Sequence, residues 1–139
     1  FISMDMFQYH PHQNVYFNFL TGFNSHEKFD NDYWGLSNKQ AFEILLSKES
    51  KNPIYVGSAT PISLENSKKI LNKKDRDRLV IKPNIEADYI IDNYRNWFGE
   101  YNKKRYKIPS NFSKYTDISS GILRRKIISI YYNIDKIKF

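Results

Sequence analysis

Hydrophobic residues occur in short runs and stripes along the chain, separated by polar stretches rich in Asn, Asp and Lys. The clearest stripe is formed by Ala41, Ile44 and Leu45, which recur at helical spacing, with Phe42 and Leu46 widening it. This periodicity predicts an amphipathic helix that begins at about residue 37 and ends near residues 48–50, before the following proline.

The start of this helix carries its own signal. Ser37 is a natural N-cap, and Gln40 three residues later completes a capping-box pattern, in which each side chain satisfies a backbone N–H of the first turn. Gly35 permits a tight turn, and Tyr33 and Trp34 come directly before it. We therefore predict a turn at Gly35 that leads straight into a capped helix.

Three apolar runs of strand length follow, at residues 54–57, 78–81 and 87–91. Between the first two, residues 63–73 predict a second helix, with Leu64, Ser67, Ile70 and Leu71 on one side. Residues 75–78 alternate in charge and predict a solvated turn. A further β-prone segment at residues 14–19 precedes the first helix.

The C-terminal third has a different character. Residues 93–121 are polar, rich in Asn, Lys and Tyr, and predict a long irregular excursion. Residues 124–134 alternate, with Ile128 and Ile130 against Ile127 and Tyr131, which predicts a final antiparallel strand at or near a sheet edge. The whole pattern predicts an α/β fold: a single layered domain over residues 1–139, with a mixed, mostly parallel sheet flanked by helices and an antiparallel C-terminal strand.

Composition supports a folded domain and excludes some chemistry. The 139 residues are 40% hydrophobic and 17% aromatic, which is enough to bury a core. The chain has no cysteine, so disulfides and thiolate chemistry are excluded. Its longest apolar runs are only a few residues, and no signal peptide is recognised. Because the chain starts with Phe1 and not with Met, we expect a fragment of a longer protein.

Positive charge is concentrated in the last quarter. The chain carries 22 Lys and Arg against 15 Asp and Glu, and ten of these basic residues but only two acidic ones lie in residues 103–139. A basic end favours anionic partners such as lipid headgroups, lipid-linked phosphates or nucleic acid, and the alternative is a solvated face. The candidate contacts with an anionic surface are Lys103, Lys104, Arg105, Arg124, Arg125 and Lys126.

No motif assembles a catalytic or metal site. His10 and His12 are two residues apart, but no carboxylate or third histidine is tied to them by spacing, which favours a structural or solvent role. Residues 57–60 (Gly-Ser-Ala-Thr) stand between a predicted strand and a predicted helix, where α/β sheets bind phosphate, yet one glycine also fits a plain turn. We therefore predict no catalytic residue, no metal and no cofactor in this chain.

Two stretches carry a resemblance to a known family. They are YHPHQNVYFNFLTG at residues 9–22 and KFDNDYWGLSNKQAFEIL at residues 28–45. The pattern resembles the region after the last membrane span of bacterial polytopic glycosyltransferases similar to the dolichyl-phosphate-mannose protein mannosyltransferase family. His12 stands where Tyr is usual in that pattern, and Asp30 where Glu is usual. After residue 45 the resemblance is only general.

The resemblance implies that this chain is the C-terminal periplasmic or extracellular domain of a bacterial cytoplasmic-membrane protein. The whole protein would transfer sugar from a polyprenyl-phosphate carrier, with its catalytic acid outside this chain. This domain would support or recognise substrate. Its partners would be the membrane part of the same chain, a polyprenyl-phosphate sugar or glycan acceptor, and anionic lipid headgroups, without nucleic acid.

Two alternatives stay open. One is a stand-alone carbohydrate- or anionic-lipid-binding module. The other is a nucleic-acid-binding domain that uses the basic C-terminal region, where Lys and aromatic residues are interleaved, although no RNA-binding signature is present.

Tyr33 and Trp34 admit two interpretations. In the structural one, which we favour, Trp34 packs against the core beside the helix start. In the functional one, Tyr33 and Trp34 stack on a sugar, and Asp30, Asp32 and Asn18 bind its hydroxyls. Asn18, Asp30, Asp32, Tyr33 and Trp34 are therefore the candidate ligand-binding residues.

Overall fold

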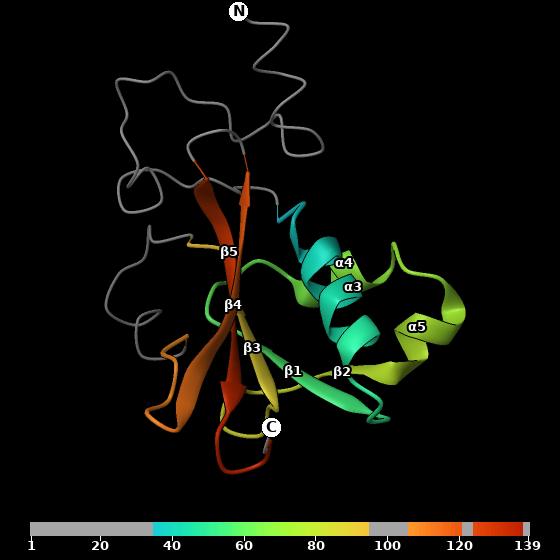
Figure 1. Ribbon diagram of the computed structural model, residues 1–139. Coiled ribbons are helices and arrows are strands. Elements are labelled where there is room, and N and C mark those ends of the chain that lie inside the picture. Colours follow the sequence, from blue (N-terminus) through green and yellow to red (C-terminus); the bar gives the residue numbers. More distant parts are fainter. Residues whose placement is uncertain (1–34, 95–105, 121–123, 138–139) are drawn as a thin grey trace, which may run out of the picture.

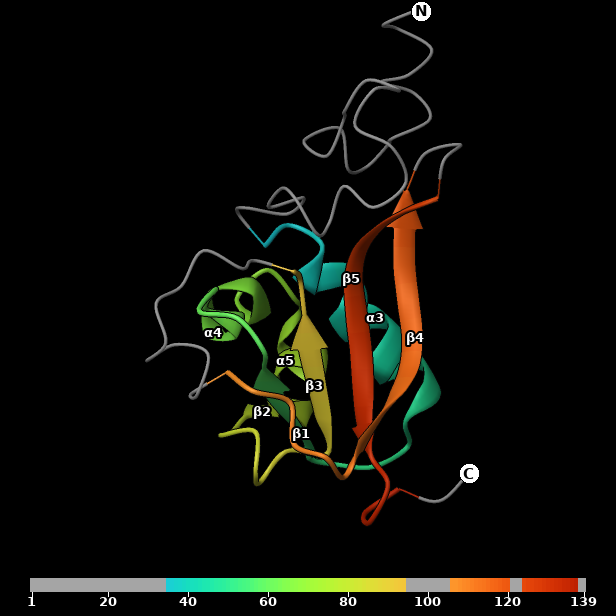
Figure 2. The same ribbon diagram turned by 90° about the vertical axis from the view of Figure 1, so that its left-hand side faces the viewer.

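The computed structural model describes residues 35–94, 106–120 and 124–137. They form one five-stranded sheet with helices α3, α4 and α5 gathered on one of its faces (Figure 1). Figure 2 looks onto the sheet, whose strands follow the order β2-β1-β3-β5-β4. The α/β class is confirmed, with a mixed sheet that is parallel at one end and antiparallel at the other. The predicted strand at residues 14–19 lies outside the described residues.

Helix α3, Asn38–Lys48, confirms the predicted amphipathic helix, since Ala41, Phe42 and Leu45 are fully buried. The turn before it is also confirmed, because Gly35 has a φ of +68°. The prediction of a capping box is wrong. Ser37 has helical backbone angles and makes no side-chain capping hydrogen bond. Instead, the first backbone bond runs from the N–H of Asn38 to the carbonyl of Gly35, at 3.2 Å.

The predicted helix over residues 63–73 is shorter in the structure, and a separate helix begins where it was predicted to end. Helix α4 spans Leu64–Lys68, and helix α5 spans Lys73–Arg78, where a solvated turn was predicted. The separate helix begins because Asn72 caps α5, its side chain accepting a hydrogen bond from the N–H of Asp75 at 3.0 Å. As a result, Ile70 lies between the two helices and is 62% exposed instead of facing the core.

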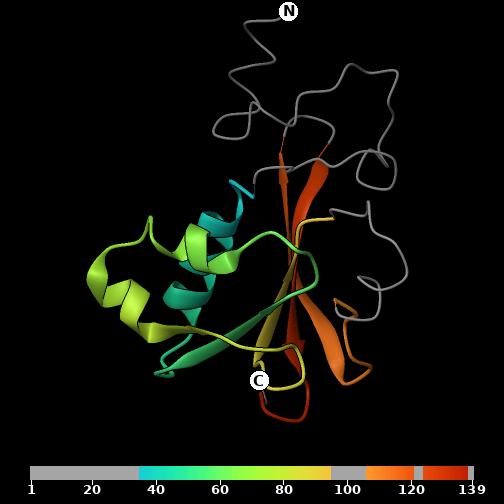
Figure 3. The same ribbon diagram turned by 180° about the vertical axis from the view of Figure 1, so that it is seen from behind.

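The parallel half of the sheet is built around β1, Ile54–Ser58. It pairs with β2, Leu79–Ile81, and with β3, Tyr89–Asp92. Val56 lies opposite Ile81 on one side and Tyr89 on the other, so β2 pairs with the first half of β1 and β3 with the second half. The connecting segment, residues 82–88, therefore passes from one side of β1 to the other (Figure 3).

The antiparallel half contains β5, Arg125–Asn133, which pairs with β3 and with β4, Phe112–Ser120. One prediction is corrected here. The polar excursion over residues 93–121 contains the strand β4, which was predicted to be irregular. Strand β5 is second from the edge of the sheet, which agrees with its predicted place at or near an edge. The antiparallel direction of β5 is confirmed.

The core lies between the helices and one sheet face. Val56, Tyr89 and Ile130 line this face and pack with Phe42 and Leu45 of α3. The Tyr89 ring is fully buried, and its hydroxyl donates a hydrogen bond to the Glu49 carboxylate just past the end of α3. Burial and this hydrogen bond raise the pKa of Tyr89.

Candidate functional site

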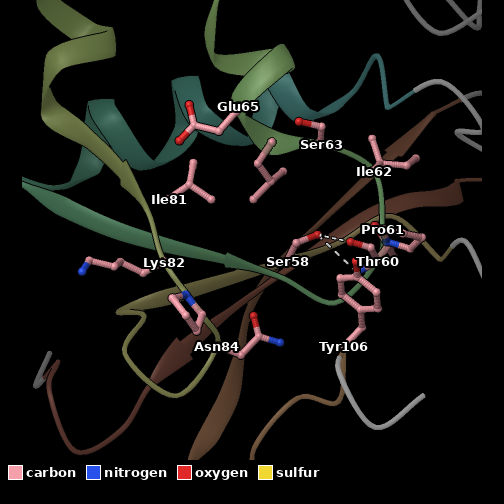
Figure 4. Close-up of a pocket in the computed structure, with 12 residues that line it drawn as sticks. Ser58, Thr60, Pro61, Ile62, Ser63, Glu65, Ile81, Lys82, Asn84 and Tyr106 are labelled. Atoms are coloured by element: carbon pink, nitrogen blue, oxygen red, sulfur yellow. Dashed lines mark hydrogen bonds between the residues drawn. The ribbon is translucent and has the colours of Figure 1, made fainter. Parts of the chain in front are cut away.

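A pocket of about 360 Å³ lies where the parallel strands β1 and β2 end (Figure 4). We call it the carboxyl-end pocket. Besides Lys82, its polar lining residues are Ser58, Thr60, Ser63, Glu65, Asn84 and Tyr106. Open α/β sheets bind ligands outside the carboxyl ends of their strands, where the connections diverge. Here the chain leaves β1 toward α4 and leaves β2 toward β3, so the pocket occupies that position.

The turn after β1 shapes one wall of this pocket. The Ser58 hydroxyl donates to the carbonyl of Thr60 at 2.6 Å and accepts from the N–H of Thr60 at 3.2 Å. The N–H of Ala59 donates to the carbonyl of Ile91 at 2.9 Å, which extends the pairing with β3. The Ser58 hydroxyl therefore closes the turn through the backbone of Thr60. Neither of these two contacts is with a base that could activate the hydroxyl as a nucleophile.

The segment after β2 supplies the opposite wall. A Cβ placed on Gly57 would lie 2.3 Å from Asn84 Oδ1 and 3.2 Å from Ala87 Cβ, so the absent side chain lets this segment lie directly on β1. The Asn84 amide donates to the carbonyl of Lys107 at 3.2 Å. This bond ties the segment to the loop that carries Tyr106, which also lines the pocket.

The lining combines hydroxyl, amide, carboxylate and phenol groups with an apolar surface from residues such as Ile62 and Ile81. Lys82 also lines the pocket, but its side chain extends away from the other labelled residues (Figure 4). A polyhydroxylated ligand needs both donors and acceptors, and it can pack its C–H groups on an aromatic ring. The lining suits such a ligand better than it suits a compact anion.

A second polar group joins β4 and β5 to Tyr94, which lies two residues past the end of β3, on the sheet face away from the helices. The Ser129 hydroxyl donates to Asp117 and is hydrogen-bonded to the Tyr94 hydroxyl. Lys114 and Lys126 lie 3.4 Å and 3.7 Å from the Asp117 carboxylate. Burial raises the pKa of Asp117, but the Ser129 hydrogen bond and the two lysines outweigh it, so the pKa is lowered. Burial raises the pKa of Tyr94 to about 12. Because these groups bind one another, we assign the network to holding Tyr94, β4 and β5 together.

Most predicted site residues lie outside the described part of the chain. These are Asn18, Asp30, Asp32, Tyr33, Trp34, Lys103, Lys104 and Arg105. Of the other candidate anion contacts, Arg124 is exposed with a φ of +45°, and Lys126 is partly buried beside Asp117. Arg125 opens β5, and its side chain is outside the described part.

Sequence reasoning missed Glu65, Asn84 and Tyr106 as lining residues. Gly57 was the available signal, because a glycine inside a strand often marks a close backbone approach. Nothing in the sequence showed which segment approaches it, so the composition of the opposite wall was not predictable from Gly57 alone.

Within residues 35–94, 106–120 and 124–137, no group of three or more His, Cys, Asp or Glu is placed to hold a metal ion. No helix of these residues is both long enough and apolar enough to cross a membrane. Comparison of the chain with protein-family models, with curated proteins and with solved structures gives no match.

Proposed function

We propose that this chain is a saccharide-recognition domain and that the saccharide binds in the carboxyl-end pocket. The observation that carries the proposal is the lining of this pocket at the ends of β1 and β2. Its cavity of about 360 Å³ falls at the small end of the range for ligand sites, which suits one or two sugar rings.

Three features of the pocket support a sugar over other small ligands. Glu65 offers carboxylate oxygens that can accept from ligand hydroxyls, and Asn84 offers an amide with both donor and acceptor atoms. Tyr106 offers an aromatic ring on which the C–H face of a sugar can pack. We assign Glu65 the strongest contact, since hydrogen bonds to an ionised group are stronger than neutral ones.

We further propose that the domain belongs to a membrane glycosyltransferase that uses polyprenyl-phosphate sugars, on the extracytoplasmic side, and that it recognises substrate without transferring sugar itself. The resemblance of residues 9–45 to such enzymes supports this context. The test is the mass and cell fraction of the native protein, detected with an antibody against this domain. A band several times larger than 16.7 kDa in membranes is expected, and a free band of this size would refute the membrane context.

Saccharide binding is tested by titrating the ¹⁵N-labelled chain with methyl α-D-mannopyranoside and with other methyl glycosides. Shifts are expected at the backbone amides of Ser58 and Asn84. Glu65→Gln removes one charge and should weaken binding about tenfold, as expected for one lost charge-assisted hydrogen bond. Glu43→Gln is the matched control, because Glu43 is also an exposed helical glutamate but lies on α3, away from the pocket.

Two results would overturn the assignment of this pocket. One is the absence of any glycoside-dependent shift at Ser58 and Asn84. The other is an equal affinity for Glu65→Gln and Glu43→Gln, which would place the sugar elsewhere on the chain.

A further inference from the structure

We propose that a second cavity, beside the amino ends of β1 and β3, binds a phosphate group. It has a volume of about 660 Å³, and Lys51, Lys82 and Lys136 line it together with Tyr55 and Asp88. The turn after β5 and the segment over residues 82–88 meet here, as seen near the C-terminus in Figure 3. We call this cavity the lysine pocket. It shares only Lys82 with the carboxyl-end pocket.

A buried carboxylate anchors two of the three lysines. The Asp88 side chain is 1% exposed, and its Oδ2 lies 2.6 Å from the Lys51 ammonium and accepts from the N–H of Tyr55 at 3.2 Å. Its Oδ1 has no hydrogen bond among the described residues, and the Lys136 ammonium lies 3.9 Å from it. A buried carboxylate requires nearby cations, so Asp88 holds both ammonium groups at the same cavity.

The Tyr55 ring brings the third lysine to the same place. The ammonium groups of Lys51 and Lys82 lie 5.6 Å and 6.0 Å from the centre of this ring, within the range of a cation–π interaction. Lys82 also lies 3.2 Å from the Glu86 carboxylate, an exposed pair four residues apart. Three ammonium groups are therefore held around one cavity by a carboxylate, a ring and a surface ion pair.

These lysines retain donors for a ligand. Each ammonium group has three N–H donors. Lys51 uses one for Asp88, and Lys136 uses two for the carbonyls of Glu86 and Ala87, at 2.6 Å and 3.4 Å. Three cations face the two carboxylates of Asp88 and Glu86, which leaves an excess of positive charge. A phosphate has several acceptor oxygens and matches the compact point charge of lysine.

Ile85 lies at the lining of this cavity and is 81% exposed. An exposed apolar side chain next to basic groups is typical of segments that bind the surface of an anionic bilayer. The phosphate is therefore either the headgroup of a lipid or a soluble phosphate ester, and the chemistry of the lysines is the same for both. This inference does not depend on saccharide binding in the carboxyl-end pocket.

Two binding measurements distinguish the two sources. In the first, the ¹⁵N-labelled chain is titrated with glucose 1-phosphate, and the backbone amides of Tyr55 and Asp88 are followed. In the second, the chain is sedimented with phosphatidylcholine vesicles that contain phosphatidic acid, and with vesicles of phosphatidylcholine alone. The glycoside titration, followed at the amides of Ser58 and Asn84, is a separate experiment, so failure of one site is separable from failure of the other.

The variants are Lys82→Gln and its matched control Lys39→Gln. Lys39 and Lys82 each lie in an exposed ion pair with a glutamate four residues later, at 3.1 Å and 3.2 Å, and only Lys82 lines the cavity. Lys51 is left intact, because its loss would leave the buried Asp88 charge without its closest cation. Lys136→Gln serves as a second test that leaves the carboxyl-end pocket unchanged.

Lys82→Gln and Lys136→Gln should each weaken phosphate binding about tenfold, while Lys39→Gln keeps the wild-type affinity. A response to glucose 1-phosphate supports a soluble ester. Sedimentation with phosphatidic acid vesicles, without a response to glucose 1-phosphate, supports a lipid headgroup. If neither probe binds, or if Lys39→Gln weakens binding as much as Lys82→Gln, the proposal is overturned.

Discussion

The contact between Gly57 and the segment over residues 82–88 allows a stability prediction to be worked from distances. In Gly57→Ala, the new Cβ would lie 2.3 Å from Asn84 Oδ1, 3.2 Å from Asn84 Cα and 3.2 Å from Ala87 Cβ. Carbon atoms prefer separations of roughly 3.5–4.0 Å. The Asn84 amide can rotate away, but the Cα and Cβ atoms move only if the whole segment shifts by a few tenths of an ångström.

The expected cost follows from two opposing terms. Inserting a methyl group into a packed position costs roughly 1–3 kcal/mol. Replacing glycine by alanine inside a strand returns roughly 0.5–1 kcal/mol, because glycine loses more conformational freedom on folding. The overpacking term is larger at the centre of its range, so Gly57→Ala should lower the free energy of unfolding by about 1 kcal/mol.

The assay is equilibrium urea unfolding of the wild type, Gly57→Ala, Asn84→Ala and the double variant. Asn84→Ala removes the amide that the new methyl group meets, so the cost of Gly57→Ala should be smaller in that background. An unchanged or increased stability of Gly57→Ala would refute the reasoning. It would mean that residues 82–88 do not lie on β1. This segment would then not line the two pockets as described.

Three further predictions concern the rest of the domain. Gly35→Ala should cost about 1–3 kcal/mol, because φ is +68° and the new Cβ would lie 2.5 Å from Ile62 Cγ2; an unchanged urea midpoint would contradict this. Phe42→Ala should cost about 3–5 kcal/mol, because Phe42 is fully buried; thermal and urea unfolding measure it, and a cost below about 1 kcal/mol would place the ring outside the core. The pKa of Asp117 is lowered from 3.8, so its stabilising contribution is complete above that value and is lost as pH falls through the lower folded pKa. Asp117→Asn should therefore be less stable than the wild type at pH 7 and should lose less stability below pH 4. Urea unfolding at a series of pH values measures this, and an equal loss of stability in the two proteins below pH 4 would refute it.

Much of the fold was predictable because its elements have regular patterns. The α3 stripe and the short runs that became β1, β2 and β3 have the expected spacing. Strand β4 was missed because its apolar residues Phe112, Tyr115 and Ile118 recur every three positions instead of every two. The register shift between Lys114 and Thr116 explains this, since it inserts an extra residue that turns Tyr115 toward Tyr89 and Tyr132.

The break between α4 and α5 had a signal that the apolar pattern concealed. Asn72 stands three residues before Asp75, which is N-cap spacing, but Leu64, Ser67 and Leu71 continue at helical intervals across the boundary. The two pockets were less predictable than the fold. Lys51, Lys82 and Lys136 are distant in sequence. The parallel pairing of β2 and β3 with β1 brings Lys51 and Lys82 together, and the antiparallel pairing of β5 with β3 adds Lys136.

The two outer strands of the described sheet have a consequence for self-association. Strand β2 is only three residues long, and Pro83, which has no N–H to donate, follows it closely. Strand β4 has two register shifts, between Lys114 and Thr116 and between Ile118 and Ser119, that interrupt its regular ladder. Neither edge offers a long, flat row of backbone groups to another chain. Copies of this domain crowded on one surface should therefore resist edge-to-edge addition of strands and the aggregation that follows from it.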